Sequence, residues 1–383
     1  MKISVIAFYY EWNLGDAVIG DCVKDRLQRE FPEAEVVLVD LFGRTSFPKR
    51  ELLPMERYRA LKKRQHLRFF CEKYTPLKKE TSHEEYVFQK ILPGLKRAAD
   101  TACDAVVFAG GQIFADTLAS AVAYLTSQFT QRKIPVYFVS GGAGAMESQK
   151  LTQQMRTVMH HPMVRMISVR DHPERISERF QVHAVQTWDQ GLWASETYPV
   201  KPAKNGKIGL GIMYPFDIPE HRIRRFYLDM IAYFEQNQID WCPFTNGSDM
   251  DEAFAREILQ TAEAKWPSCA DKLLPSPESP AQLAEQIAAF RGIISLRLHS
   301  HIISASFNIP AVGVNWDDKV RDFYNLCGLP ERCVSAGERP EQIWQIYRQA
   351  EQEGWPVSLI QERRAETLKM LTDSIQKDLP TLS

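Results

Sequence analysis

The clearest chemical candidates in this sequence lie together in segment 292–301, where an apolar run ends in polar side chains. Residues 292–296 are predicted to form a strand, and the apolar residues from Ile302 onward predict a helix directly after it. A helix N-terminus offers free N–H groups and the positive end of a dipole, and Arg297 adds a charge. We therefore predict a phosphate or carboxylate pocket here, with Ser295 and Ser300 as further ligands of the anion.

His299 would then stand beside the bound anion. Histidine is the side chain most easily placed near pH 7 as a proton donor or acceptor, so it is a natural general acid. The structural alternative is that His299 caps the helix and that Arg297 pairs with a buried carboxylate. The sequence favours the functional interpretation, because no acidic partner is adjacent to Arg297.

Two further cations follow predicted strands. Lys319 comes after strand 311–314 and its polar turn, which puts it on the same sheet edge as Arg297, where a second cation would help hold a doubly charged ligand. Taken alone, Lys319 is more simply interpreted as a solvated residue in the first turn of a helix. Arg170 follows strand 164–169 and is a third candidate anion ligand.

In the first half of the chain, strand 2–8 leads into Asn13, Gly15 and Asp16, after which a helix begins. Asn13 and Gly15 suit a tight turn. Asp16 could cap the helix or accept a proton from a ligand hydroxyl, and spacing alone favours the cap.

Glycine turns follow two other strands. They would let a ligand approach the backbone closely, although each turn alone is a weak signal and neither matches the full dinucleotide fingerprint. The residues concerned are Gly110, Gly111, Gln112, Gly141 and Gly142.

Short apolar runs alternate with amphipathic stretches along the whole chain, which is typical of parallel sheets built from βαβ units. Strands are predicted at 2–8, 35–40, 104–108, 134–139 and 164–169, and then at 207–213, 239–243, 292–296 and 311–314. The predicted fold class is α/β, with two doubly wound Rossmann-like lobes and the ligand in the cleft between them. The lobes span 1–200, with a helical insertion at about 44–100, and 207–350, and a helix in 355–383 packs back on the body.

Composition excludes several classes of protein. The chain has 383 residues, 44% of them hydrophobic, and a net charge of −1, which argues against nucleic-acid binding. No stretch is long and apolar enough for a membrane span, and no metal-ligand cluster is evident. Seven scattered cysteines without a C-x-x-C pair suggest reduced thiols and a cytoplasmic protein.

Taken together and in order, these motifs resemble the polysaccharide pyruvyl transferase family. The resemblance runs over roughly residues 3–330, and two departures, at Glu11-Trp12 and after Gly110-Gly111, border the presumed acceptor side. The matching motifs are Asn13-Leu14-Gly15-Asp16, the Gly-Gly turn after Asp104, Val169-Arg170-Asp171, Arg297-Leu298-His299 and Lys319.

The resemblance implies a GT-B-like fold and transfer of a pyruvyl group from phosphoenolpyruvate to a sugar of a cell-surface or exopolysaccharide precursor, forming a ketal. His299 would be the acid, and Arg297, Arg170 and Lys319 would hold the donor. Asp16 would be the acceptor-side base. Phosphoenolpyruvate would be a co-substrate, with no cofactor or metal required. The alternative is a GT-B glycosyltransferase that uses a nucleotide sugar.

A basic segment at 49–79 stands out from the balanced remainder of the chain. Its cations are interleaved with Leu61, Leu67, Phe69 and Phe70. Related enzymes commonly act on lipid-carried sugars, so this segment predicts a peripheral contact with the inner face of the membrane. An ordinary amphipathic helix with a solvated basic face has the same pattern, and the sequence favours that simpler interpretation.

Overall fold

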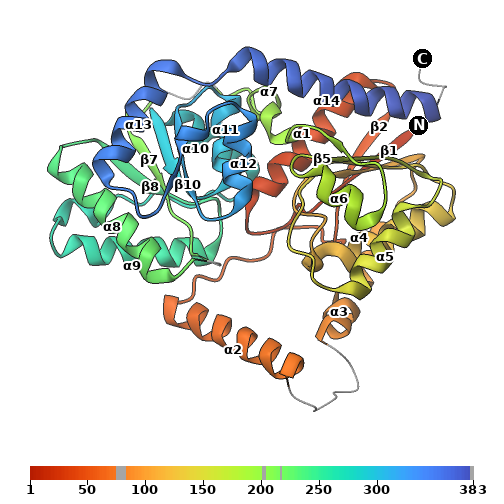
Figure 1. The fold of residues 1–383 in the computed structure, drawn as a ribbon, viewed down its shortest axis with the longest axis horizontal. Coiled ribbons are helices and arrows are strands. Elements are labelled where there is room, and N and C mark those ends of the chain that lie inside the picture. Colours follow the sequence, from red (N-terminus) through yellow and green to blue (C-terminus); the bar gives the residue numbers. More distant parts are fainter. Residues whose placement is uncertain (75–82, 201–203, 216–217, 380–383) are drawn as a thin grey trace.

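The computed structural model describes residues 1–74, 83–200, 204–215 and 218–379, apart from the side chains of 65–74 and 83–85. Two parallel sheets form the centres of two lobes that stand side by side (Figure 1). The first sheet has the strand order β2-β1-β3-β4-β5-β6, and the second has the order β11-β10-β9-β7-β8. Helices cover both sheets, so the fold is α/β with two Rossmann-like lobes, as predicted.

The strands are short and deeply buried. In the first lobe they are β1 (Lys2–Ala7), β2 (Glu35–Asp40), β3 (Ala105–Ala109), β4 (Val136–Gly141), β5 (Val164–Val169) and β6 (Val185–Gln186). In the second lobe they are β7 (Ile208–Gly211), β8 (Trp241–Phe244), β9 (Gly292–Ser295), β10 (Ala311–Asn315) and β11 (Cys333–Ser335). Every strand predicted from the sequence is present. The edge strands β6 and β11 were not predicted, because two or three residues are too few to show a period.

The helices follow the strands in the usual alternation. Up to residue 200 they are α1 (Leu14–Glu30), α2 (Met55–Tyr74), α3 (His83–Ala99), α4 (Asp116–Gln131), α5 (Gln149–Met159), α6 (Pro173–Phe180) and α7 (Ala194–Thr197). After it they are α8 (Glu220–Gln236), α9 (Asp249–Glu263), α10 (Pro280–Ala289), α11 (Leu298–Ser306), α12 (Asp318–Leu326), α13 (Pro340–Glu353) and α14 (Val357–Asp378). Within the described residues, no helix combines the length and the apolar character that a membrane span requires.

Strand order fixes where a ligand can sit. In the first sheet the strand order reverses between β1 and β3, because β2 and β3 lie on opposite sides of β1, and in the second sheet it reverses in the same way between β7 and β9. The loops that leave neighbouring strands at such a point diverge and open a crevice at the carboxyl ends of the strands. The residues after β1, β3 and β5 in one lobe therefore face those after β9 and β10 in the other.

Helix α2 is inserted in the chain of the first lobe but packs on the second, at the bottom of Figure 1. Met55 and Tyr58 join the hydrophobic core of the second lobe. Arg59 donates to Glu220 at 2.7 Å and to Glu257 at 2.6 Å, on α8 and α9. The insertion therefore crosses from one lobe to the other, because its apolar face and its cations both find partners there.

Helix α14 makes the return crossing along the opposite side of the molecule (Figure 1). Ile360 and Leu368 pack in the core that joins the lobes, while Leu371 and Ile375 pack with the strands of the first sheet. Tyr137 of β4 donates to Asp378 at 2.7 Å. The C-terminal helix thus packs back on the body of the protein, as predicted from its amphipathic spacing.

Candidate active site between the lobes

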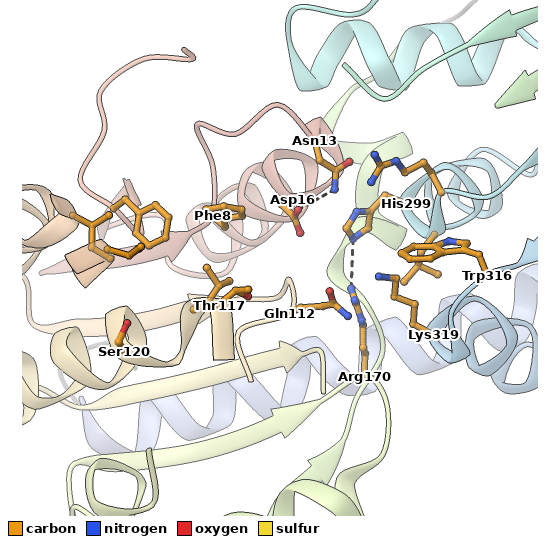
Figure 2. A pocket seen from close by; sticks show the side chains of 16 residues that line it. Phe8, Asn13, Asp16, Gln112, Thr117, Ser120, Arg170, His299, Trp316 and Lys319 are labelled. Atoms are coloured by element: carbon orange, nitrogen blue, oxygen red, sulfur yellow. Dashed lines mark hydrogen bonds between the residues drawn. The ribbon is translucent and has the colours of Figure 1, made fainter. Parts of the chain in front are cut away.

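A cavity of about 400 Å³ lies between the lobes at the carboxyl ends of the strands. Figure 2 shows its side chains converging from both lobes. The residues predicted from the sequence that line it are Asn13, Asp16, Gln112, Arg170, Arg297, His299 and Lys319. The structure therefore brings together, across the two lobes, most of the polar residues singled out in the sequence.

His299 lies in the first turn of α11 and is only 8% exposed. Its Nε2 is 3.5 Å from Nη1 of Arg170, a long hydrogen bond drawn dashed in Figure 2. Because a guanidinium can only donate, Nε2 is the acceptor and the proton of the neutral ring is on Nδ1. Burial lowers the pKa of His299 to about 4, with nearby Asp16 opposing this and the surrounding cations adding to it. In the free protein His299 is therefore neutral at pH 7.

Arg297 is the N-cap residue of α11, so His299 does not cap this helix. The guanidinium of Arg297 donates from Nε to Oδ2 of Asp251 at 2.9 Å, and Nη2 bonds to the same oxygen. Asp251 is fully buried in the first turn of α9, and its Oδ1 accepts from the backbone N–H of Tyr214 at 2.9 Å. The alternative that Arg297 pairs with a buried carboxylate is thus correct. Arg297 nevertheless lines the cavity.

Lys319 is not a solvated surface residue, since its side chain is 15% exposed and lines the cavity. Its Nζ is 3.2 Å from Oδ2 of Asp317 and 4.4 Å from the centre of the Trp316 ring. Burial lowers the pKa of Lys319, while Asp317 favours the charged form. The simpler interpretation of Lys319 from sequence was therefore wrong, because the turn after β10 folds over it.

Arg170 completes the cationic side from the first lobe. Its Nη1 donates to Oδ2 of Asp189 at 2.6 Å, and its Nε is 3.4 Å from Asp171. Burial opposes the charge of Arg170, but Asp189 and Asp171 outweigh burial and raise its pKa. Each of the three cations is therefore paired with a carboxylate of its own.

Asp16 lies on the first-lobe side of the cavity, in the first turn of α1. The N-cap of this helix is Asn13, so the favoured interpretation of Asp16 as a cap was wrong. Oδ2 of Asp16 accepts from Nδ2 of Asn13 at 3.1 Å. The pair presents a carboxylate and an amide to the cavity (Figure 2).

The predicted glycines bring backbone close to site side chains. A Cβ at Gly15 would collide with the ring of His299, so the first turn of α1 and α11 can meet only through a glycine. A Cβ at Gly142 would lie 2.9 Å from Nη2 of Arg170. These positions serve packing across the cleft as well as any approach of a ligand.

The turn after β3 has a related role. Gly110 and Gly111 have φ angles of +46° and +67°, which a residue with a Cβ rarely adopts. A Cβ at Gly111 would lie 3.1 Å from Oδ1 of Asp16, and one at Gly110 would collide with Ile19. Gly141 instead packs against Phe114 and Ile113.

The two predicted serine ligands lie behind the cavity wall. Ser295 Oγ accepts from the backbone N–H of Arg297 at 3.1 Å. Ser300 Oγ donates to Oδ1 of Asn246 at 2.9 Å. Both serines are fully buried, so in this structure they fix the strand-to-helix turn and do not face the cavity.

Sequence reasoning missed the remainder of the lining. It consists of apolar and hydroxyl side chains from helices and loops of the first lobe, together with Leu298 and Trp316 of the second, and such residues look like ordinary core or surface positions in a sequence. Those of the first lobe are Phe8, Phe42, Val87, Ile91, Thr117, Leu118 and Ser120.

Solved structures with a similar fold include three bacterial or archaeal proteins. S. aureus MnaA, in a co-structure with UDP, is 11% identical with a TM-score of 0.58 and coverage of 99% of this chain and 97% of that chain. The UDP-GlcNAc 2-epimerase of Neisseria meningitidis is 10% identical, with a TM-score of 0.55 and coverage of 98% and 100%. That of Methanocaldococcus jannaschii is 12% identical, with a TM-score of 0.56 and coverage of 96% and 99%. These likenesses show a shared two-lobed, GT-B-like fold.

A comparison with curated protein sequences gave no match. The model of the polysaccharide pyruvyl transferase family, in contrast, matches residues 13–318. That span covers most of the chain and includes Asp16, Arg170, Arg297 and His299. The chain therefore belongs to the polysaccharide pyruvyl transferase family.

Proposed function

We propose that this protein transfers a pyruvyl group from phosphoenolpyruvate to two hydroxyls of a saccharide and so forms a pyruvate ketal. The observation that supports this most directly is the cluster of Arg170, Arg297 and Lys319 around His299, at the N-terminus of α11. Phosphoenolpyruvate carries a phosphate and a carboxylate close together. Three fixed cations and a helix N-terminus suit such a compact polyanion.

Donor binding and protonation of His299 are coupled in this proposal. In the free protein the cations and burial disfavour imidazolium, and Arg170 occupies Nε2. A bound polyanion would offset the cations and compete for the N–H groups of Arg170. His299 would then take up a proton on Nε2 only when the donor is in place.

The reaction follows from these positions. His299 protonates the methylene carbon of phosphoenolpyruvate, which becomes a methyl group, while positive charge develops at the carbon that bears the phosphate. A sugar hydroxyl adds to that carbon and loses its proton to a base. The C–O bond to phosphate then breaks, and a second hydroxyl closes the ketal and gives up its proton. One of the two hydroxyl protons restores the proton that His299 gave to the methylene carbon. The other leaves with inorganic phosphate.

Asp16 is the proposed base for the acceptor hydroxyl. It lines the same cavity as His299 but comes from the opposite lobe, and Asn13 fixes one of its oxygens. The other oxygen can accept a hydroxyl proton. Phosphoenolpyruvate is the sole co-substrate of this scheme, which uses neither a metal nor a further cofactor.

Calorimetric titration of the protein with phosphoenolpyruvate, and separately with a panel of nucleotide sugars, tests the donor. We expect saturable binding of phosphoenolpyruvate and phosphate release that requires a saccharide. Hydrolysis or transfer of a nucleotide sugar, without any binding of phosphoenolpyruvate, would instead establish the glycosyltransferase alternative, for which the same anion-binding features would serve.

A separate proposal concerns segment 49–79 and a lipid-linked acceptor on the cytoplasmic face of a membrane. Arg59 and Lys62 contact the second lobe, whereas Lys63 and Arg64 are exposed. The side chains of Leu67, Phe69 and Phe70 lie outside the described residues.

Co-sedimentation with vesicles that contain anionic lipid tests this contact. We expect low-salt pelleting that is lost in Lys63→Glu/Arg64→Glu and retained in the charge-matched control Lys265→Glu/Lys369→Glu, since each basic residue near the surface contributes about 1 kcal/mol. A wild-type protein that stays in the supernatant at low salt would exclude the membrane contact.

A further inference from the structure

A second cavity, of about 480 Å³, adjoins the active-site cavity on the first lobe. It lies among α3, α4 and α5, and Ser120 of α4 lines both cavities. The two cavities are therefore adjacent along α4. Its lining includes the aromatic and polar side chains of Phe88, Gln89, Tyr124, Ser127, Gln154 and Thr157.

One face of α4 forms the floor that links the two cavities. Thr117, Ser120, Tyr124 and Ser127 follow one another at intervals of three or four residues, so they lie on the same side of the helix. With a rise of 1.5 Å per residue, this row of hydroxyl groups is about 15 Å long. In Figure 2, Thr117 and Ser120 lie on the side of the cavity away from Lys319. We call the two joined cavities over this face the α4 groove.

The chemistry of the α4 groove changes along its length. Near His299 it is cationic, but in the second cavity Lys150 is the sole charged lining residue among those described, and hydroxyls and amides make up most of the rest. The Phe88 and Tyr124 rings meet edge to face with centroids 6.0 Å apart. Hydroxyls, amides and aromatic rings together suit the alternating polar edges and apolar faces of sugar rings.

We propose that the acceptor is an oligosaccharide, with its reacting sugar between His299 and Asp16 and its further sugars in the α4 groove. The proposal rests on the proposed function for the identity of the reacting end, but not for the occupancy of the groove. A lipid tail would fit less well, because burying the amides of Gln89 and Gln154 against alkyl chains leaves these polar groups unpaired.

Calorimetric titration with neutral mono-, di- and trisaccharides tests the groove directly. The panel comprises the chito-, malto-, cello-, galacto- and manno-oligosaccharide series, with octyl glucoside as a lipid-like probe. In at least one series we expect affinity to rise about tenfold or more from mono- to trisaccharide, which corresponds to about 1.4 kcal/mol. If no trisaccharide binds better than its monosaccharide, or if only the octyl chain adds affinity, the inference is wrong.

Two substitutions test whether the gain in affinity with saccharide length comes from the α4 groove. Tyr124→Ala and Gln154→Ala should each reduce the gain from chain length while leaving monosaccharide binding unchanged. Gln154 is exposed, so its replacement should not disturb folding, and Gln153→Ala on the same helix but outside the lining is the matched control. A gain that survives in both groove variants would overturn the assignment of the site.

Titration of phosphoenolpyruvate into the same variants separates the two proposals. We expect its affinity to be unchanged in Tyr124→Ala and Gln154→Ala. Failure of the protein to bind phosphoenolpyruvate while oligosaccharides still bind would reject the donor and keep the groove. Normal binding of phosphoenolpyruvate, with no dependence of saccharide affinity on chain length, would reject the groove and keep the donor.

Discussion

The two halves of the active-site cavity are built on different principles. In the donor half, Arg170, Arg297 and Lys319 are each held by a carboxylate of the protein, from Asp189, Asp251 and Asp317. Apart from Asn13 and Asp16, the acceptor half is made of apolar and hydroxyl side chains from the loops after β1 and β2 and from α3 and α4. Charge fixed in advance suits a small polyanion, whereas neutral shape and hydrogen bonding suit a sugar chain. Changes in the two halves should therefore have separable effects.

The largest effect is expected where the two halves meet, at His299. We expect His299→Ala to lower turnover by about 10²–10⁴-fold or more, because a general acid acts mainly on the transition state. Affinity for phosphoenolpyruvate should stay within about tenfold, because the cations remain. Phosphate release and calorimetry measure the two quantities. A variant with wild-type turnover would remove His299 from the chemistry.

Gly15 tests the contact between the halves without changing a polar group. In Gly15→Ala the new Cβ would meet the His299 ring, so the ring or the lobes must move. A misplacement of about 1 Å can lower turnover by about 10²-fold. Gly337→Ala is the control, because the nearest atom to its Cβ would be 3.6 Å away. Equal turnover in the two variants would show that the contact is dispensable.

The donor half is tested through Arg297 and its partner. Arg297→Lys keeps the charge but loses the planar fork, and we expect KM for phosphoenolpyruvate to rise by about tenfold or more. Asp251→Asn should raise the same KM more than it lowers kcat, because Asp251 positions Arg297 and does not touch the donor. Loss of one partner of a buried pair also costs about 3–5 kcal/mol of stability.

Asp249→Asn provides the matched control for Asp251. It lies in the same turn of α9 but bonds to Arg50 of the insertion, at 2.7 Å. We expect it to leave the KM for phosphoenolpyruvate unchanged. If Asp249→Asn and Asp251→Asn raise KM equally, α9 acts as a whole and Asp251 has no individual role in positioning Arg297.

The difference between the donor half and the acceptor half also explains which site residues could be predicted from the sequence. Arg297, His299 and Arg170 stand where apolar runs end, so residue type and position both mark them as site residues. Asp251 lies 46 residues from Arg297 along the chain, and only the fold, which brings the first turn of α9 to the turn between β9 and α11, reveals the pair. Val87, Thr117 and Ser120 sit within amphipathic helices, where nothing local distinguishes a ligand-facing side chain from an ordinary surface one.

The smallest effect expected is an exchange of less than one proton on donor binding. His299 is neutral at pH 7 in the free protein, because its pKa lies at about 4. If the bound donor raises that pKa toward or above 7, binding at pH 7 takes up protons, and donor affinity must fall as pH rises through the pKa of the bound state. Titrations in buffers with different ionisation enthalpies measure the uptake. The phosphate of the donor itself titrates near pH 6, so the informative quantity is the difference from His299→Gln. Equal proton uptake by the two proteins would mean that the cations hold the donor without charging His299, and that another group supplies the proton to the methylene carbon.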